Sequence, residues 1–208
     1  MKKLLIIGAG GFGREVYTWL QSNPSNKKEW ELAGFLDDNL DALKSFGEFA
    51  SVSAIKGHQV SPQNVYVCGL GLPVMKSKIL SPFLSAGAEF ITFIHPTATL
   101  GSRIKIGRGV FICPGVSVST DISLGDFVMI GPNSTIGHDA MIGDWTTLCA
   151  QCDVTGKVLI GSEVFIGSRV SIIPSKEIGS RTILGAGAVV VSNVPDGVTM
   201  VGNPARIL

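Results

Sequence analysis

The fold is decided by residues 135–160, TIGHDAMIGDWTTLCAQCDVTGKVLI, in which an aliphatic residue stands at every sixth position. The same phase continues outward without a slip from Ile94 to Val190, and all 17 positions are Leu, Ile or Val. An α-helix repeats every 3.6 residues and a strand every two, so neither produces a strict period of six. A solenoid does, with three short strands in each 18-residue coil and one aliphatic side chain of each hexad directed inward.

Small residues complete each hexad. Four positions after the aliphatic comes a second small or apolar set that we also expect to face inward: Val110, Val116, Val128, Ala140, Val158, Val164, Val170 and Ala188. A glycine often follows the aliphatic directly, and we expect it to turn the corner between two strands, often with a positive φ. The hexad at 172–177 departs from the pattern because Lys176 takes the small inward slot, so we expect a distortion there.

Residues 1–93 follow a different pattern, that of a small α/β domain. We expect strands at 3–7, 30–36, 65–68 and 89–94, and helices at 14–21 and 76–86. Gly8, Gly10 and Gly13 form a G-x-G-x-x-G motif between the first strand and the first helix, where such a loop can approach a phosphate. The domain is only about half of a dinucleotide fold. A nucleotide-sugar site therefore fits better than an NAD site, with a tight structural turn as the alternative.

Composition and charge exclude several classes of protein. Lys and Arg number 17 against 16 Asp and Glu, and a net charge of +1 gives no field that would attract nucleic acid or an anionic membrane. No apolar run approaches the roughly 20 residues of a membrane helix, so we expect a soluble cytoplasmic protein. Cys149 and Cys152 form a C-x-x-C without further ligands, and Cys152 falls in the inward slot, so we expect no metal. A three-histidine zinc site fails because His58 lies far outside the repeats.

His138 is the one histidine well inside the repeats. It stands two residues after an inward aliphatic, so we expect it outside the core near a corner, where an ordinary solvated side chain is the simplest interpretation. Two neighbours favour chemistry instead. Asp139 can orient the imidazole or stabilise its charge, and Gly156, one coil later, leaves room for a ligand beside it. These neighbours favour a catalytic role for His138 over an ordinary solvated side chain.

The hexad pattern resembles that of the hexapeptide-repeat acyltransferases, and the ending Val194-Pro195-Asp196-Gly197 … Val201-Gly202-Asn203-Pro204-Ala205-Arg206 is similar to their closing segment. The resemblance implies a left-handed parallel β-helix over residues 94–208 that assembles as a homotrimer. The N-terminal domain and the x-H-[DE]-x-x-I-G hexad at His138 resemble one branch of this family, the bacillosamine-pathway, perosamine and sialic-acid sugar acetyltransferases. In that branch the histidine is the general base, and a glycine one coil later donates its N–H to the thioester oxygen.

The resemblance implies acetyl transfer by direct attack from acetyl-CoA, a co-substrate, to a nucleotide-linked amino sugar. The reaction would be N-acetylation of a 4-amino-4,6-dideoxy sugar in surface-glycan biosynthesis. The implied catalytic residues are His138, Asp139 and Gly156. Acetyl-CoA would lie between two subunits against Thr147, Gly156, Ser168 and Ala186. The acceptor would bind the domain at 1–93 through Gly10, Gly11, Phe12, Asp37 and Asp38.

Three other functions stay open. One is O-acetylation of sialic acid or a related sugar, which uses the same site on a different acceptor. Another is a β-helical scaffold with a nucleotide-sensing domain, although a bare scaffold would not need His138 and Asp139 at a corner. The last is an oxidoreductase, which NADH binding would reveal.

Overall fold

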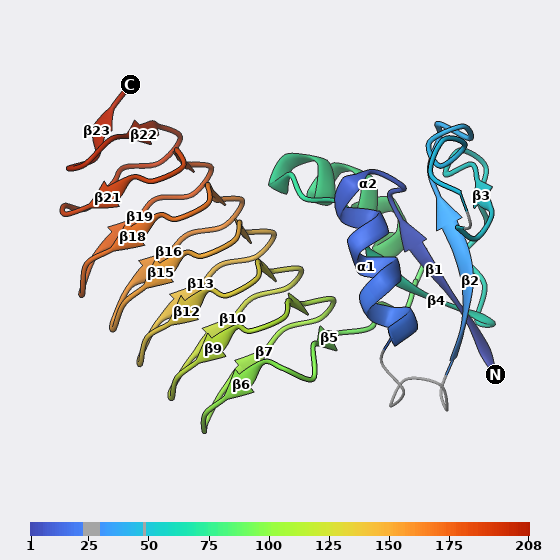
Figure 1. Ribbon diagram of the computed structural model, residues 1–208, viewed down its shortest axis with the longest axis horizontal. Coiled ribbons are helices and arrows are strands. Elements are labelled where there is room, and N and C mark those ends of the chain that lie inside the picture. Colours follow the sequence, from blue (N-terminus) through green and yellow to red (C-terminus); the bar gives the residue numbers. More distant parts are fainter. Residues whose placement is uncertain (23–29, 48) are drawn as a thin grey trace. The chain divides into compact units, whose positions relative to one another are not determined.

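The structure is a computed structural model that describes residues 1–22, 30–47 and 49–208. Its contacts divide into two compact units (Figure 1). One unit comprises Met1–Gly71 and Met75–Ile91, and the other comprises Leu72–Val74 and Thr92–Leu208. Among the described residues, no helix has the length and apolar composition needed to cross a membrane.

The N-terminal unit is a parallel sheet with two helices. Its elements are β1 (Lys2–Ile7), α1 (Gly11–Ser22), β2 (Trp30–Leu36), β3 (Val52–Ser53), β4 (Asn64–Cys68) and α2 (Pro73–Ser85). The strand order is β3-β2-β1-β4, so the sheet grows outward in both directions from β1. The sequence did not predict β3, which is very short. The strand expected at 89–94 is divided: Phe90 makes a single parallel bridge to Tyr66 of β4, and the named strand Phe93–Ile94 pairs within the solenoid.

The glycine-rich loop between β1 and α1 packs without side chains. A Cβ atom on Gly13 would overlap the carbonyl oxygen of Gly8, and one on Gly69, just after β4, would lie 2.8 Å from that same oxygen. Gly8 has a φ of 103°, a conformation that favours glycine. The loop therefore brings the start of α1 against the carboxyl ends of β1 and β4.

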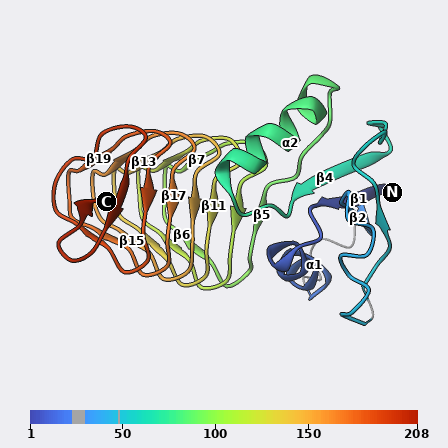
Figure 2. The same ribbon diagram turned by 90° about the horizontal axis from the view of Figure 1, so that it is seen from above.

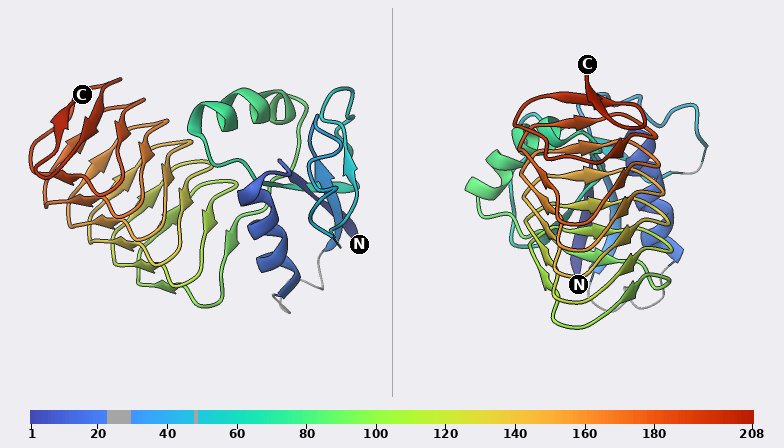
Figure 3. Two further views of the ribbon diagram at one scale, coloured as in Figure 1. Left: turned by 45° about the horizontal axis from the view of Figure 1, so that its top comes forward. Right: turned by 90° about the vertical axis from the view of Figure 1, so that its left-hand side faces the viewer.

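The C-terminal unit is a three-sided parallel solenoid whose coils stack one on the next (Figures 2 and 3). The eight-stranded sheet holds β5 (Phe93–Ile94), β8 (Phe111–Ile112), β11 (Met129–Ile130), β14 (Thr147–Leu148), β17 (Phe165–Ile166), β20 (Ile183–Leu184), β22 (Thr199–Val201) and β23 (Arg206–Ile207). The six-stranded sheet holds β6 (Thr99–Leu100), β9 (Ser117–Val118), β12 (Thr135–Ile136), β15 (Asp153–Val154), β18 (Ser171–Ile172) and β21 (Val189–Val190). The five-stranded sheet holds β7 (Lys105–Ile106), β10 (Ser123–Leu124), β13 (Met141–Ile142), β16 (Leu159–Ile160) and β19 (Glu177–Ile178).

The pairing register confirms the period. Ile136 pairs with Val118 on one side and with Val154 on the other, so neighbours in a sheet stand three hexads apart along the chain. Strand β23 is the exception, since it pairs antiparallel with β22 and closes the eight-stranded sheet.

The inward aliphatics form the core of the solenoid over most of its length. Every hexad aliphatic from Ile112 to Val190 is at most 4% exposed. Ile94, Leu100 and Ile106 keep the same register, opposite the buried Ile112, Val118 and Leu124, but Ile94 is 36% exposed and the other two are partly exposed. The first coil has a neighbouring coil on one side only, which leaves its aliphatics less covered.

The glycines that follow the aliphatics do not turn the corners, so this expectation is wrong. The positive φ falls two residues later, usually on a residue other than glycine, as at Asp139 (60°) after Gly137 and Trp145 (64°) after Gly143. The glycines serve close approach instead. A Cβ atom on Gly131 would lie 2.5 Å from the carbonyl carbon of Cys149, and one on Gly143 would lie 2.6 Å from that of Gly161. At these two glycines the next coil leaves no room for a side chain.

The distortion expected at Lys176 is also absent. Glu177 keeps its place in the register opposite Leu159, whose N–H donates to the Lys176 carbonyl at 2.9 Å. Lys176 is only partly buried, and a long flexible stem lets its ammonium group leave the interior. The register shortens later, where Ile178 pairs with Val194 and not with Asp196, the residue three full hexads further on.

Alanine at Gly143 is expected to lower the free energy of unfolding by about 1–3 kcal/mol, because the new methyl group must push two coils apart. Gly71→Ala is the matched control, since a Cβ atom at Gly71 meets nothing within 4 Å. Urea denaturation of both variants measures the difference. Equal midpoints would show that close approach is not the reason for glycine at Gly143.

Candidate active site

His138 and Asp139 form the turn between β12 and β13, at the edge where the six-stranded and five-stranded sheets meet. The imidazole Nδ1 and the Asp139 Oδ2 are 2.7 Å apart. A carboxylate only accepts hydrogen bonds, so Nδ1 carries the proton and Nε2 keeps a free lone pair. Both side chains are about half exposed, at 57% and 50%. The arrangement presents an oriented base to solvent.

Gly156 occupies the same edge one coil later, directly against the imidazole. A Cβ atom at Gly156 would lie 2.5 Å from His138 Nε2, so any side chain there would displace the ring. The following residue, Lys157, donates its N–H to the His138 carbonyl at 2.7 Å, which fixes the two coils together. The Gly156 N–H finds no acceptor in residues 1–22, 30–47 and 49–208. A hydrogen-bond donor therefore remains available beside the base.

A second carboxylate lies on the same edge, one coil before Asp139. Asp121 receives hydrogen bonds from Arg103 Nε and Nη2 at 2.5 and 2.6 Å. These bonds lower the pKa of Asp121, and they raise the pKa of Arg103 in turn. A groove of about 700 Å³ opens along the edge and the adjoining five-stranded sheet. Its lining includes Arg103, Lys105, Asp121, Ser123, Asp139 and Met141.

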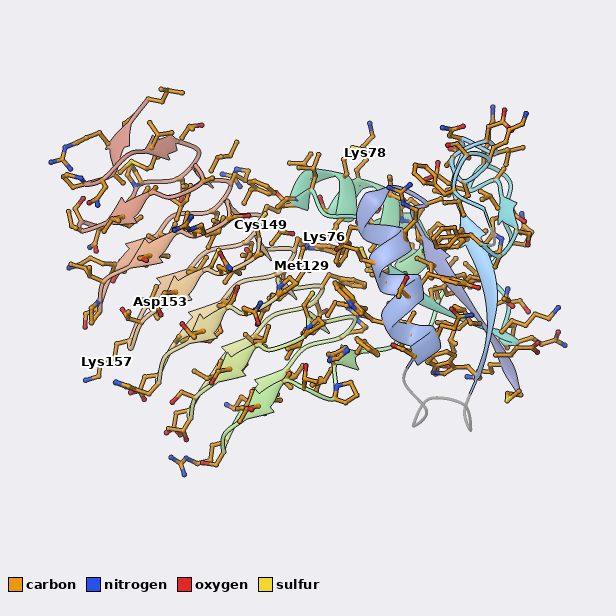
Figure 4. All side chains as sticks on the ribbon, viewed as in Figure 1. Lys76, Lys78, Met129, Cys149, Asp153 and Lys157 are labelled. Atoms are coloured by element: carbon orange, nitrogen blue, oxygen red, sulfur yellow. The ribbon has the colours of Figure 1, made fainter. Side chains whose placement is uncertain are left out.

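Ser168 and Ala186, predicted to contact the cofactor, lie on a different edge from His138. They belong to the turns between the eight-stranded and six-stranded sheets, and the Gly187 N–H donates to the Ser168 carbonyl at 2.8 Å. Thr147 is on β14, in the eight-stranded sheet, and the residue is only 1% exposed. In Figure 4, Cys149 beside β14 and Lys157 beside Gly156 lie on opposite sides of the solenoid. Within a single chain, His138, Asp139 and Gly156 lie together. Thr147, Ser168 and Ala186 lie away from them.

Thr147 has an unusual environment. Its hydroxyl oxygen is buried and has no hydrogen-bond partner in the described part of the chain. The other buried hydroxyls of the repeats, at Ser134, Thr146 and Thr182, all donate to backbone carbonyls. Those three occupy the inward slot four positions after the aliphatic, whereas Thr147 stands just before one.

The predicted acceptor residues of the N-terminal unit gather at the carboxyl ends of β1 and β2. Gly10 precedes α1, Gly11 and Phe12 are the first two residues of that helix, and Asp37 follows β2. Asp37 Oδ2 accepts the Ala9 N–H at 2.8 Å, which ties the glycine-rich loop to β2. Asp38 Oδ1 accepts the Lys56 N–H at 2.8 Å. Both carboxylates brace loops, a contribution that the sequence did not reveal.

The cysteines behave as packing residues. Cys149 and Cys152 are both free thiols, and Cys152 is buried in the inward slot with its pKa raised to about 11 by desolvation. Within the described ranges, no three His, Cys, Asp or Glu side chains come close enough to hold a metal ion.

Two features of the structure were missed from the sequence. Lys76 on α2 is 1% exposed, and burial lowers its pKa to about 8. No sequence pattern marks it, because it stands in a helix of ordinary composition. The Arg103–Asp121 pair did leave a signal, namely opposite charges at equivalent positions of successive coils.

Comparison with known proteins supports both halves of the fold. Residues 3–83 match the family described as the PglD N-terminal domain. The comparison with curated proteins gives no significant match.

Among the solved structures that resemble the whole chain, three illustrate the match. WeeI from Acinetobacter baumannii is 28% identical, with 100% of both chains covered and a TM-score of 0.87. The acetyltransferase domain of PglB from Neisseria gonorrhoeae, in complex with acetyl coenzyme A, is 28% identical, with 100% of this chain and 99% of that chain covered and a TM-score of 0.85. PerB from Caulobacter crescentus, in complex with CoA and GDP-perosamine, is 25% identical, with 100% and 98% covered and a TM-score of 0.86. The expected α/β domain followed by a left-handed parallel β-helix is confirmed.

Proposed function

We propose that this chain, a hexapeptide-repeat acetyltransferase of the bacillosamine and perosamine type, transfers the acetyl group of acetyl-CoA to the amine of a nucleotide-linked 4-amino-4,6-dideoxy sugar. The observation that carries the proposal is the His138 imidazole, oriented by Asp139 and seated against Gly156. The relatives add support, since one structure contains acetyl coenzyme A and another contains CoA with GDP-perosamine.

The geometry supports direct transfer without an acyl-enzyme. As the sugar nitrogen attacks the thioester carbon, His138 Nε2 takes a proton from that nitrogen. The Asp139 carboxylate stabilises the imidazolium through Nδ1. The free Gly156 N–H donates to the oxyanion of the tetrahedral intermediate. When the C–S bond breaks, the CoA sulfur leaves and the imidazolium returns the proton to it, so the base is restored.

The acceptor end of the proposal rests on the N-terminal domain, residues 1–93, while 94–208 carry the transfer. The Ala9 N–H already binds Asp37. The backbone at Gly10, Gly11 and Phe12, at the start of α1, is then the part of the loop that faces a phosphate group. Asp37 and Asp38 keep lone pairs for the hydroxyl or amide groups of a nucleoside, in addition to the backbone bonds that they already accept.

A homotrimer is part of the proposal, because the predicted cofactor residues of one chain lie on separate edges. A cleft between two copies can combine the edge of His138 and Gly156 with the edge of Ser168 and Ala186 from a neighbour. Repeating one such contact closes a ring of three. Thr147 stays a weaker candidate for the same cleft, with its unpaired hydroxyl as the supporting observation.

Acetyl-CoA consumption against a panel of acceptors tests the function. The panel comprises UDP-, GDP- and dTDP-linked 4-amino-4,6-dideoxy sugars, the same nucleotides carrying the 4-hydroxy sugars, and free sialic acid. We expect CoA release with at least one amino sugar and none with its hydroxyl counterpart, and mass spectrometry should show one added acetyl group. Activity on sialic acid alone would establish O-acetylation instead. Tight binding without CoA release would favour the nucleotide-sensing scaffold.

A further inference from the structure

Four charged residues form a column on the edge that carries the base. Arg103, Asp121, Asp139 and Lys157 each stand at the third position after a hexad aliphatic, with one full coil between each and the next. All four have the same left-handed backbone conformation, with φ between 55° and 62°. We call these four residues the charged column. Its two carboxylates are neighbours in the middle, with a cation at each end.

The two carboxylates are held at the separation of adjacent coils. The Asp121 N–H donates to the Ser102 carbonyl and the Asp139 N–H donates to the Thr120 carbonyl, each at 3.1 Å. Successive coils are about 4.8 Å apart, the usual strand spacing. One oxygen of Asp139 is hydrogen-bonded to His138, and Asp121 stands at the equivalent position one coil earlier.

Arg103 cancels the charge of Asp121 through a paired contact. Its Nε and Nη2 bind the two carboxylate oxygens at 2.5 and 2.6 Å, and Nη2 also reaches the Thr120 hydroxyl at 3.2 Å. Such a two-point contact fixes the guanidinium as well as attracting it. The charge of Asp139 also acts on Arg103, although less than Asp121 does. The guanidinium field therefore extends to the residue that orients the base.

We propose that the Arg103–Asp121 pair is a positioning element that sets the charge around His138. The positive charge of Arg103 compensates the negative charge of Asp121, so that Asp139 is the one carboxylate whose charge acts uncompensated on the imidazole. This deepens the proposed function and rests on His138 as its base. Arg103 and Asp121 are positioning residues, since they act through Asp139 and the local field and not by touching the transferred group.

Substitutions at Arg103 and Asp121 leave the other charged residues near His138 unchanged. Lys157 stands on the next coil, Lys105 lines the groove, and Asp153 lies on β15 with an oxygen bound by the Thr135 hydroxyl. In the described part of the chain, none of them hydrogen-bonds to the side chain of Arg103 or Asp121, so changing the pair leaves these groups in place.

Titration of the histidine rings by NMR tests the proposal directly. The chain has three histidines, and His138→Ala identifies the signal of interest. Arg103→Met leaves Asp121 uncompensated, which favours imidazolium, so the midpoint of the His138 titration should rise by roughly 0.5 pH unit at low salt. Asp121→Asn leaves Arg103 uncompensated and should lower that midpoint by a similar amount. The double variant should return it to the parent value, and high salt should shrink both shifts.

A charge-preserving variant separates the electrostatic role from a structural one. Arg103→Lys keeps the cation but not the paired geometry, so it should leave the midpoint nearly unchanged. Arg103 and Asp121 side chains are 69% and 39% exposed, and their removal leaves the aliphatic core intact. The rising limb of kcat/KM against pH should move with the NMR midpoint in each variant.

The outcomes separate this inference from the proposed function. Single-variant shifts in the same direction, or no shift in either, would overturn the role of the pair, whatever the activity. Opposite NMR shifts in a protein that transfers no acetyl group would uphold the charge relation and overturn the function. Opposite shifts with an unmoved kcat/KM profile would show that His138 is not the titrating base.

Discussion

Alanine at His138 is expected to lower kcat by about 10²- to 10⁴-fold, the usual contribution of a general base. The affinity for acetyl-CoA should stay nearly the same, because the thioester and pantetheine are proposed to contact Gly156 and residues of another edge. Steady-state kinetics and calorimetric titration with acetyl-CoA measure the two effects separately. Loss of both together would indicate that the edge itself had been disrupted.

Asp139→Asn is the graded companion to this variant. An amide oxygen can still accept the hydrogen bond from Nδ1, but it carries no charge to stabilise the imidazolium. We therefore expect a smaller loss of kcat than in His138→Ala. If His138→Ala keeps more than about a tenth of the parent kcat, its loss falls below even the weakest general-base contribution, and His138 is not the base.

Aspartate at Ile142 is expected to unfold the protein or reduce its stability by about 4 kcal/mol or more. Ile142 is 2% exposed, in the centre of the aliphatic column, where an unpaired carboxylate has no partner and no water. Thermal unfolding followed by circular dichroism measures the effect.

Gln151→Asp is the matched control, because it introduces the same charge on the outside of the same coil. Gln151 is exposed in a turn with a φ of 59°, a conformation that aspartate tolerates better than most residues. Its melting temperature should change little. Equal losses in the two variants would mean that the assignment of inward and outward positions is wrong.

The solenoid could be predicted because its six-residue period is visible in the sequence as a repeat of aliphatic side chains. A strict hexad of Ile, Leu and Val fixes which residue faces inward, and Ile136, Ile142 and Leu148 are all buried as expected. The structural reason for the glycines that follow the aliphatics could not be predicted in the same way. Whether Gly143 serves a positive φ or a close approach depends on the backbone of the next coil, at Gly161.

The clustering of candidate site residues could be predicted where they are neighbours in sequence or one coil apart. His138 and Asp139 are adjacent, and Gly156 is one coil further, so period and pattern place all three together. Arg103 and Asp121 obey the same spacing but belong to no known catalytic motif, which is why they were missed. In the N-terminal domain, the bond from Asp37 to the Ala9 N–H depends on strand pairing that local pattern does not define.

Because the register between coils is constant, the solenoid can be lengthened or shortened without disturbing its stacking only by whole coils of 18 residues. Deleting one hexad between His138 and Gly156 would move every later residue to the next edge of the solenoid, so Gly156 would no longer lie one coil above His138. Deleting three consecutive hexads would remove one whole coil and return each later residue to its own edge of the solenoid. Insertions and deletions of whole 18-residue coils therefore keep equivalent residues stacked on one another and change only the length of the solenoid, whereas those of other lengths break the stacking.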